Sequence, residues 1–405
     1  MMMKIFFKFI FSISAIFAGV VLLLFIALSI HDSPVYAWRI ITMLQSDTGD
    51  INHFPTRSID NGPVVSNLPI EILPIPKLVK FQYKGSERTE SLQDLILRTD
   101  TTAFVVIRDD KIIHQEYPEG KYEQVNTSFS VAKSFDSALI GAAIQDGFID
   151  SENDLVIKYV PEIKGRGLHD LRIHNLLRMD SGIRYFSADD RLFIFEPLSD
   201  DALTYYPPDL RKIALSVQAS ITPIGATFKY NNFHPLLEGL IIERVTGMPV
   251  AEYLQEKIWK PMGAEFPASW SLDSEKSGFE KMESGINATA VDFARFGLLY
   301  LHNGYWNGNQ ILPEAWVQKS TLPDPNDNRF FEGYPSWPEI GGYYGYHWWG
   351  LMNNDGSYDF MARGHLGQII YVSPEKNMVV VRLGSEPDSN LLWFNVIRSL
   401  INQMP

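Results

Sequence analysis

The chain contains no cysteine among its 405 residues. This absence excludes disulfides, thiolate catalysis, and zinc or iron–sulfur sites built on cysteine. The sequence also has no glycine-rich phosphate-binding loop and no His-Glu-x-x-His zinc motif, so no metal and no organic cofactor is expected. Positive charge is scarce: 35 Lys and Arg face 48 Asp and Glu, which gives a formal net charge of −13. Nucleic acid is therefore not an expected partner, since phosphate binding needs a basic surface.

Apolar residues are plentiful by comparison. Hydrophobic residues make up 45% of the chain and aromatic residues 13%. This composition is typical of a protein with a large core, and it excludes a disordered chain. The length predicts one large domain or two moderate ones.

A long apolar run without charge, residues 9–30, occupies the N-terminus. As a helix it spans about 33 Å, enough to cross a bilayer core. Lys4 and Lys8 precede the run, so the positive-inside rule places the rest of the chain in the periplasm or outside the cell. Val35-Tyr36-Ala37 is a candidate cleavage site, and a removed signal peptide is the alternative. The length of the run favours an uncleaved, single-pass anchor in the inner (cytoplasmic) membrane.

Hydrophobic periodicity divides the chain into three parts. Residues 1–38 are the anchor or signal segment, residues 39–100 form an extension with little periodicity, and residues 101–405 form the main domain. Strand patterns lie near both ends of this domain, and helical patterns lie between them. The order predicts an α+β fold in which N-terminal and C-terminal strands share one antiparallel sheet, flanked by helices and a mostly helical insert. The expected strands are 102–107, 112–117, 369–373 and 378–383, and the expected helices are 130–146, 171–179, 235–245, 249–258, 291–301 and 391–401.

The first of these helices begins with Ser130-Val131-Ala132-Lys133. A serine with a lysine three positions later has its hydroxyl on the same helix face as the amine, one turn away. The nearby helix dipole and burial both favour loss of the lysine's proton, so Lys133 is a candidate base for a Ser130 nucleophile. The pattern alone also occurs by chance in a chain of this length.

Two further short motifs follow along the chain. Tyr230-Asn231-Asn232 lies in a loop before a helix, and His365-Leu366-Gly367 directly precedes a strand. Each motif has a structural alternative: Tyr230 as a packed aromatic, Asn232 as a helix cap, and His365 as a strand-end histidine. The order and placement of the three motifs make the set specific.

As a set, these residues resemble the serine β-lactamase and penicillin-binding-protein superfamily. They are most similar to the class C-like branch, which includes family VIII esterases and 6-aminohexanoate-dimer hydrolases. Tyr230-x-Asn232 stands where other members have Ser-x-Asn, and His365-x-Gly367 stands where many have Lys-Thr-Gly. The resemblance covers roughly residues 100–395, with supporting stretches at 176–182, 345–349 and 364–368.

The resemblance implies a reaction through an acyl-enzyme. Ser130 would attack a carbonyl carbon while Lys133 takes the hydroxyl proton. Tyr230 would pass a proton to the leaving group and later activate water. A phenol suits this role only if a nearby cation lowers its pKa, and Lys133 is the expected cation.

The resemblance also assigns roles around this centre. Asn232 would hydrogen-bond Lys133 and the substrate carbonyl, and His365 would position Tyr230 or polarise the site. Backbone N–H groups of Ser130 and Gln368 would form the oxyanion hole. Gly367 would leave room for substrate along the strand edge. Since a histidine is mostly neutral near pH 7, His365 favours small esters and linear amides over the carboxylate-bearing substrates of β-lactamases and D,D-peptidases.

The sequence therefore predicts a membrane-anchored, exported serine hydrolase that acts on a small-molecule ester or linear amide. One alternative is a penicillin-interacting, D,D-peptidase-like protein or weak β-lactamase. Another is a non-catalytic protein that binds cell-wall fragments. The Asp-x-Gly triplets at 47–49 and 180–182 match aspartic proteases, but Asp47 lies beside the membrane and Asp180 closes a helix, so a carboxylate pair is not expected.

Overall fold

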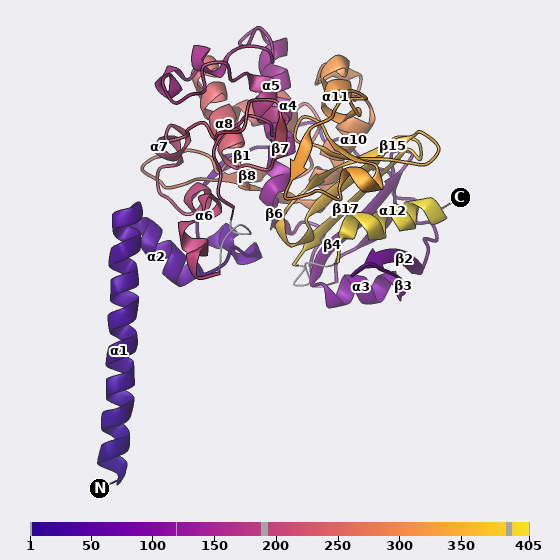
Figure 1. The fold of residues 1–405 in the computed structure, drawn as a ribbon. Helices are drawn as coiled ribbons and strands as arrows, with labels where there is room; N and C mark the ends of the chain where they lie inside the picture. Colours follow the sequence, from indigo (N-terminus) through magenta and orange to yellow (C-terminus); the bar gives the residue numbers. More distant parts are fainter. Residues whose placement is uncertain (1, 119, 188–192, 386–390, 405) are drawn as a thin grey trace.

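A seven-stranded antiparallel sheet forms the centre of the fold (Figure 1). The structure is a computed structural model and describes residues 2–118, 120–187, 193–385 and 391–404. The strand order is β13-β14-β15-β16-β17-β4-β5. The predicted sharing of one sheet by strands from both ends of the domain is confirmed, because β4 pairs with β17. The strands are β4 (Thr101–Arg108), β5 (Lys111–Glu116), β13 (Gly342–Tyr344), β14 (Trp349–Met352), β15 (Tyr358–Arg363), β16 (Ile369–Ser373) and β17 (Met378–Gly384).

Both faces of this sheet are buried, which explains the continuous apolar runs of its central strands. Val379 and Val381 of β17 face one core, while Val380 faces the other. Helix α10 (Ala290–Leu301) covers the first face, and α12 (Trp393–Gln403) covers the second. The sheet is therefore the middle layer between helices, as the α+β prediction requires.

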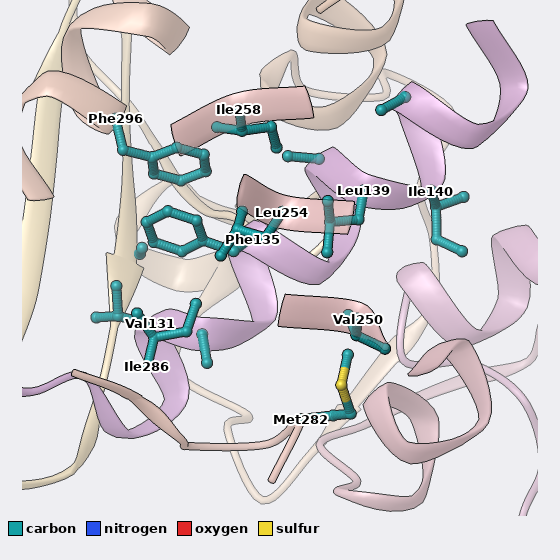
Figure 2. Close-up of a cluster of buried hydrophobic side chains, with 14 of the residues drawn as sticks. Val131, Phe135, Leu139, Ile140, Val250, Leu254, Ile258, Met282, Ile286 and Phe296 are labelled. Atoms are coloured by element: carbon teal, nitrogen blue, oxygen red, sulfur yellow. The ribbon is translucent and has the colours of Figure 1, made fainter. Parts of the chain in front are cut away.

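The helical insert is built around α4 (Ala132–Gln145) and α8 (Phe233–Thr246), which pack against each other. The expected apolar stripe is formed by Val131, which directly precedes α4, and by Phe135 and Leu139 of α4. Figure 2 shows all three in the buried cluster. The Phe135 ring stacks on Phe296 with 3.6 Å between centroids. Further α-helices of the domain are α5 (Ile173–Leu177), α6 (Asp200–Tyr205), α7 (Leu210–Ala214), α9 (Val250–Leu254) and α11 (Glu314–Thr321).

Residues 39–100 are more ordered than their sequence pattern predicts. β1 (Thr56–Ile59) pairs with β8 (Ala268–Ser271) in a second sheet of order β1-β8-β9-β6, where β6 is Val125–Thr127 and β9 is Ile286–Thr289. β2 (Leu78–Tyr83) and β3 (Ser86–Ser91) form a hairpin, which α3 (Leu92–Arg98) follows. These elements are short and pair with segments far along the chain, so their sequences show little hydrophobic periodicity. Smaller pairs are β7 (Thr227–Lys229) with β12 (Phe330–Glu332), and β10 (Tyr305–Trp306) with β11 (Asn309–Gln310).

The N-terminal helix α1 (Met2–His31) extends away from the domain (Figure 1). Its stretch Ser14–His31 is long and apolar enough to cross a membrane. A signal sequence near the N-terminus meets the same criteria of length and composition. A second helix, α2 (Pro34–Met43), follows and packs onto α6 through Tyr36, Ala37 and Ile40.

Candidate active site

Ser130 lies in a short, strained turn between β6 and α4. The turn is the 3-10 helix η2 (Phe129–Val131), so α4 begins at Ala132 and not at Ser130 as predicted. Phe129 has a φ of 44°, a left-handed conformation that costs a non-glycine residue about 1–3 kcal/mol. Ser128 holds the turn, because its N–H donates to Ile286 O at 2.7 Å and its hydroxyl donates to Ser284 O at 3.1 Å. The Ser130 side chain is thereby presented half-buried at the start of the helix.

Lys133 contacts the Ser130 hydroxyl directly. Its Nζ donates to Ser130 Oγ at 2.9 Å and to Glu283 O at 2.9 Å. The lysine is 1% exposed, and burial lowers the pKa of Lys133 to about 8. Four acidic side chains oppose this shift of the pKa: Glu283, Asp136, Asp201 and Glu238. A sizeable fraction of Lys133 is therefore neutral at mildly alkaline pH and free to accept a proton.

Tyr230 reaches the same serine from the loop after β7. Burial raises the pKa of Tyr230, although a hydrogen bond with Ser130 and the nearby Arg363 oppose the shift. The ring packs parallel to Trp349, and Lys133 Nζ lies 4.9 Å from its centroid. The expectation that Lys133 lowers the pKa of this phenol is therefore wrong. Tyr230 stays protonated near neutral pH, which suits a proton donor.

Arg363 is a permanent cation of the site that no sequence motif marks. It ends β15, and its guanidinium lies over three aromatic rings. These rings belong to Trp337, Trp349 and Phe394, at 5.6, 5.1 and 4.9 Å. The site thus has a fixed positive charge near Tyr230, two residues before the neutral His365. Only the folded structure identifies Arg363 as part of the site, because the rings that it contacts come from separate parts of the chain.

Asn232 occupies the N-cap position of α8 without capping it. Its neighbour Asn231 accepts the N–H of Phe233 at 2.8 Å instead. The Oδ1 atom of Asn232 is buried and has no hydrogen-bond partner among the described residues. The predicted bond between Asn232 Oδ1 and Lys133 is therefore not formed here, and this oxygen is left as an unused acceptor beside the site.

The His365–Gly367 turn lies across from Ser130, at the end of β15. The edge of the His365 ring contacts Phe129, with 5.3 Å between centroids, and His365 also bonds the Ser46 backbone. Although the residue is partly exposed to solvent, desolvation of the ring lowers the pKa of His365, so the ring is mostly neutral near pH 7. The ring forms no hydrogen bond with Tyr230 among the described residues, and its implied role in polarising the site stays a prediction. Gly367 has a φ of 78°, which glycine adopts without strain.

Gln368 connects this turn to the sheet. Its buried side-chain amide donates to Gly384 O, and its Oε1 accepts the Gly384 N–H at 3.0 Å. The backbone N–H of Gln368, one of the two implied oxyanion donors, donates to His365 O at a long 3.4 Å. A bond of this length is weak, so a better acceptor can replace it.

A cavity of about 490 Å³ lies on the helical side of Tyr230, but none of the candidate catalytic residues Ser130, Lys133 and Tyr230 lines it. Lys229 and Asn231, which flank Tyr230 in the chain, line one wall, and Tyr185 lines another. Lys229 pairs with Glu332 at 2.5 Å on its rim. The cavity has the size of a small-molecule pocket. Across the ranges that the structure describes, no three His, Asp or Glu side chains gather in an arrangement that could hold a metal ion.

Asp136 is a buried carboxyl group one turn beyond Lys133. It is 0% exposed, and neither of its oxygens has a hydrogen-bond partner in the described part of the chain. Burial raises the pKa of Asp136 well above its ordinary value, Glu238 adds to the shift, and Lys133 opposes it. The group therefore binds its proton more tightly in the folded protein than in the unfolded chain.

We expect the Asp136→Asn variant to be more stable than the wild type at pH 8. Because the folded-state pKa is raised, the wild type loses stability as pH rises from the unfolded pKa of about 4 toward the folded value. Each kcal/mol shifts Tm by roughly 2–4 °C in a large domain. Thermal unfolding should show a Tm difference that grows from pH 5 to pH 8. The exposed Asp150→Asn is the control, and a difference independent of pH would contradict the account.

Comparison with known proteins agrees with this geometry. The Beta-lactamase family model matches residues 96–392. The chain is 27% identical over 326 residues to the 6-aminohexanoate-dimer hydrolase of Paenarthrobacter ureafaciens, which covers 77% of this chain and 79% of that protein.

Solved structures share the fold. One is described as "Putative 6-aminohexanoate-dimer hydrolase from Bacillus anthracis", with a TM-score of 0.73 and 23% identity over 92% of this chain and 94% of that one. A penicillin-binding protein from Bacillus halodurans has a TM-score of 0.58 and 16% identity, over 77% of this chain and 100% of that chain. With a family model that spans most of its length, this chain belongs to the β-lactamase family and is a serine hydrolase.

Proposed function

We propose that this protein is a membrane-anchored, exported hydrolase that cleaves an ester or linear amide through an acyl-enzyme on Ser130. The observation that carries the proposal is the 2.9 Å contact between Ser130 Oγ and Lys133 Nζ, an amine whose pKa burial lowers to about 8. A nucleophile paired with a base that is partly neutral at working pH can lose its proton during attack. The anchor is the apolar stretch Ser14–His31 of α1, and Lys4 and Lys8, which precede this stretch, favour a cytoplasmic N-terminus.

The contacts of the site suggest the order of proton transfers. Ser130 Oγ attacks the carbonyl carbon and its proton moves to the neutral Lys133. The oxyanion that forms is stabilised by backbone N–H groups of Ser130 and Gln368. The bond to the leaving alcohol or amine then breaks as Tyr230 donates its proton, which the Lys133 ammonium replaces. Water then attacks the acyl carbon while Lys133 takes the water's proton. The bond from that carbon to Ser130 Oγ breaks as Lys133 returns the proton to Oγ, which releases the carboxylic acid and restores the enzyme.

Two features support a small ester or linear amide as substrate. The relative from Paenarthrobacter is named for a linear amide dimer. The neutral His365 supplies no cation where β-lactamases and D,D-peptidases meet the substrate carboxylate. Arg363 remains a cation near the site, so carboxylate-bearing substrates belong in the screen.

The test uses the full chain in detergent with a chromogenic short-chain ester and a linear amide. A burst of product equal to the enzyme concentration supports the acyl-enzyme. Slow, stable acylation by penicillin would favour the D,D-peptidase alternative. If neither substrate is turned over and a fluorophosphonate probe does not label the protein, the non-catalytic alternative replaces the proposal.

The Tyr230→Phe variant should lose amide hydrolysis more than ester hydrolysis. Because Tyr230 stays protonated, it acts as a donor to the leaving group, and an amine departs only when protonated whereas a nitrophenolate does not need a proton. We expect kcat for the amide to fall about 10²–10³-fold. Steady-state rates on a matched anilide and nitrophenyl ester measure the ratio. Tyr300→Phe, which removes a buried hydroxyl from α10, is the control, and equal losses on both substrates would contradict the assignment.

A further inference from the structure

The segment that follows α1 and α2 lies against the active site. This juxtamembrane segment, residues 44–54, contains the 3-10 helix η1 (Thr48–Asn52). The Asp47 side chain accepts the Gly49 N–H at 2.6 Å, and the Asp50 side chain accepts the Asp47 N–H at 3.3 Å, so a capping box fixes the N-terminal end of the turn. η1 packs against β6, the strand that leads into the turn of Ser130. The segment is therefore a folded part of the domain and not a free tether.

The juxtamembrane segment bridges the two sides of the site. On the sheet side, the Ser46 backbone bonds His365, and Thr48 Oγ1 lies 3.3 Å from Ser385 Oγ. On the helical side, Asp50 accepts the Tyr205 hydroxyl at 2.6 Å. Figure 1 shows α2 and α6 at the end of the domain from which α1 leaves, and the apolar contacts of Tyr36 join them.

A continuous set of contacts leads from this segment to Lys133. Lys281 Nζ donates to Tyr205 O at 2.5 Å and lies 3.1 Å from Glu283 Oε1. The Lys281 ammonium also lies between two rings, 3.7 Å from the centroid of Tyr205 and 4.4 Å from that of Phe54. The next contact is that of Glu283 O with Lys133 Nζ, at 2.9 Å. Each contact joins a different part of the chain.

The Lys281–Glu283 pair is where the juxtamembrane segment can influence the base. Lys281 is 1% exposed and Glu283 is 2% exposed, so neither charge is solvated by bulk water. A buried pair holds its geometry only when the surrounding groups are well placed. Tyr205, which Asp50 orients, and Phe54 supply the rings and the carbonyl that hold the ammonium. If they move, the Glu283 carbonyl that positions Lys133 moves with them.

We propose that the juxtamembrane segment is a structural part of the active site, in which Asp50 and Phe54 fix Lys281 and Glu283 and thereby position Lys133. The inference rests on the proposed role of Lys133 as the base. It makes Asp50, Phe54, Tyr205 and Lys281 positioning residues. It also means that a proteolytic cut beyond residue 54 removes a wall of the site along with the membrane anchor.

The test compares full-length variants in nanodiscs by hydrogen exchange and by the pH dependence of the burst. Tyr205→Phe cuts the contact to Asp50, and Phe54→Leu removes one ring from Lys281 while keeping an apolar side chain. Both should speed exchange about fivefold or more in peptides covering residues 128–134 and 281–286. The control Tyr206→Phe removes the neighbouring hydroxyl, whose contact with Leu44 O is 3.4 Å long, and should leave these peptides unchanged.

The pH dependence of the burst rate is a second measurement, and a loss of packing alone would not shift it. A loosened Lys281 neutralises Glu283 less, so the Glu283 charge favours the ammonium form of Lys133 and the acid limb of the burst rate shifts to higher pH. The other acidic groups that act on Lys133, which are Asp136, Asp201 and Glu238, are unchanged in these variants. A rise of one unit in the pKa of Lys133 lowers its neutral fraction about tenfold at pH values below that pKa. We therefore expect the burst rate at pH 7 to fall about tenfold.

The outcomes separate this inference from the proposed function. Faster exchange confined to residues 44–54 and 200–206, with an unshifted profile, would overturn the positioning role. A wild type without a burst would overturn the proposed function, while exchange that spreads to residues 128–134 would still support the structural link. If Tyr205→Phe does not fold, Phe54→Leu gives the same comparison through an independent contact.

Discussion

The Ser130→Ala variant is expected to form no acyl-enzyme and to lose turnover by about 10⁴-fold or more. The reason is that the Ser130 hydroxyl is the only proposed atom that becomes bonded to the substrate, so its removal leaves Lys133 and Tyr230 without a nucleophile to serve. Stopped-flow traces with a chromogenic ester should lack the burst. Intact-mass spectrometry of the quenched reaction should show the acyl adduct on the wild type alone.

Ser134→Ala is the matched control on the same helix. The Ser134 hydroxyl is also buried, but it donates to His347 O at 2.7 Å and forms no hydrogen bond with Lys133 or Tyr230 among the described residues. Its loss should cost stability of about 1 kcal/mol and leave the burst amplitude intact. An acyl adduct on Ser130→Ala, or an equal loss in both variants, would show that the nucleophile lies elsewhere.

The central architecture could be predicted because its strands and helices carry their own signal. β4, β16 and β17 are continuous apolar runs, since each is buried on both faces, and α10 shows a clear helical period. β13 and β14 gave no such signal, because three or four residues rich in glycine and aromatics fit several conformations. Pairing with β15 fixes the conformation of β14, and pairing with β14 fixes that of β13.

The same distinction between local and tertiary signals separates the site residues that the sequence predicts from those that it does not. Ser130, Lys133 and Tyr230 could be found because the motifs that contain them are local and the first depends on helix periodicity. Glu283 could not, since it holds Lys133 through its backbone carbonyl, a group that every residue has. Arg363 was missed for a related reason, because its effect on Tyr230 depends on where β15 ends relative to α8. Chemistry carried by side chains in short motifs is visible in sequence, whereas the electrostatic surroundings are set by the fold.

Lys133→Arg should be nearly as damaging as the loss of the nucleophile, with kcat/KM reduced about 10³-fold or more. Arginine keeps the positive charge but stays protonated at any working pH, so it cannot accept the Ser130 proton. Burial lowers the pKa of Lys133 to about 8 in the wild type. The neutral base is therefore fully present only above that pH, and kcat/KM should fall tenfold for each pH unit below it.

The two pH profiles decide whether lysine is the base or only a structural cation. The wild type should show a slope of one that levels near pH 8, and the residual activity of Lys133→Arg should show no inflection there. Lys257→Arg, at a half-exposed lysine paired with Asp146 at 2.6 Å, makes the same exchange away from the site and should reproduce the wild-type profile. An unchanged inflection in Lys133→Arg would assign the titration to another group, and Lys281 would be the next buried amine to test because it too has a pKa lowered by burial.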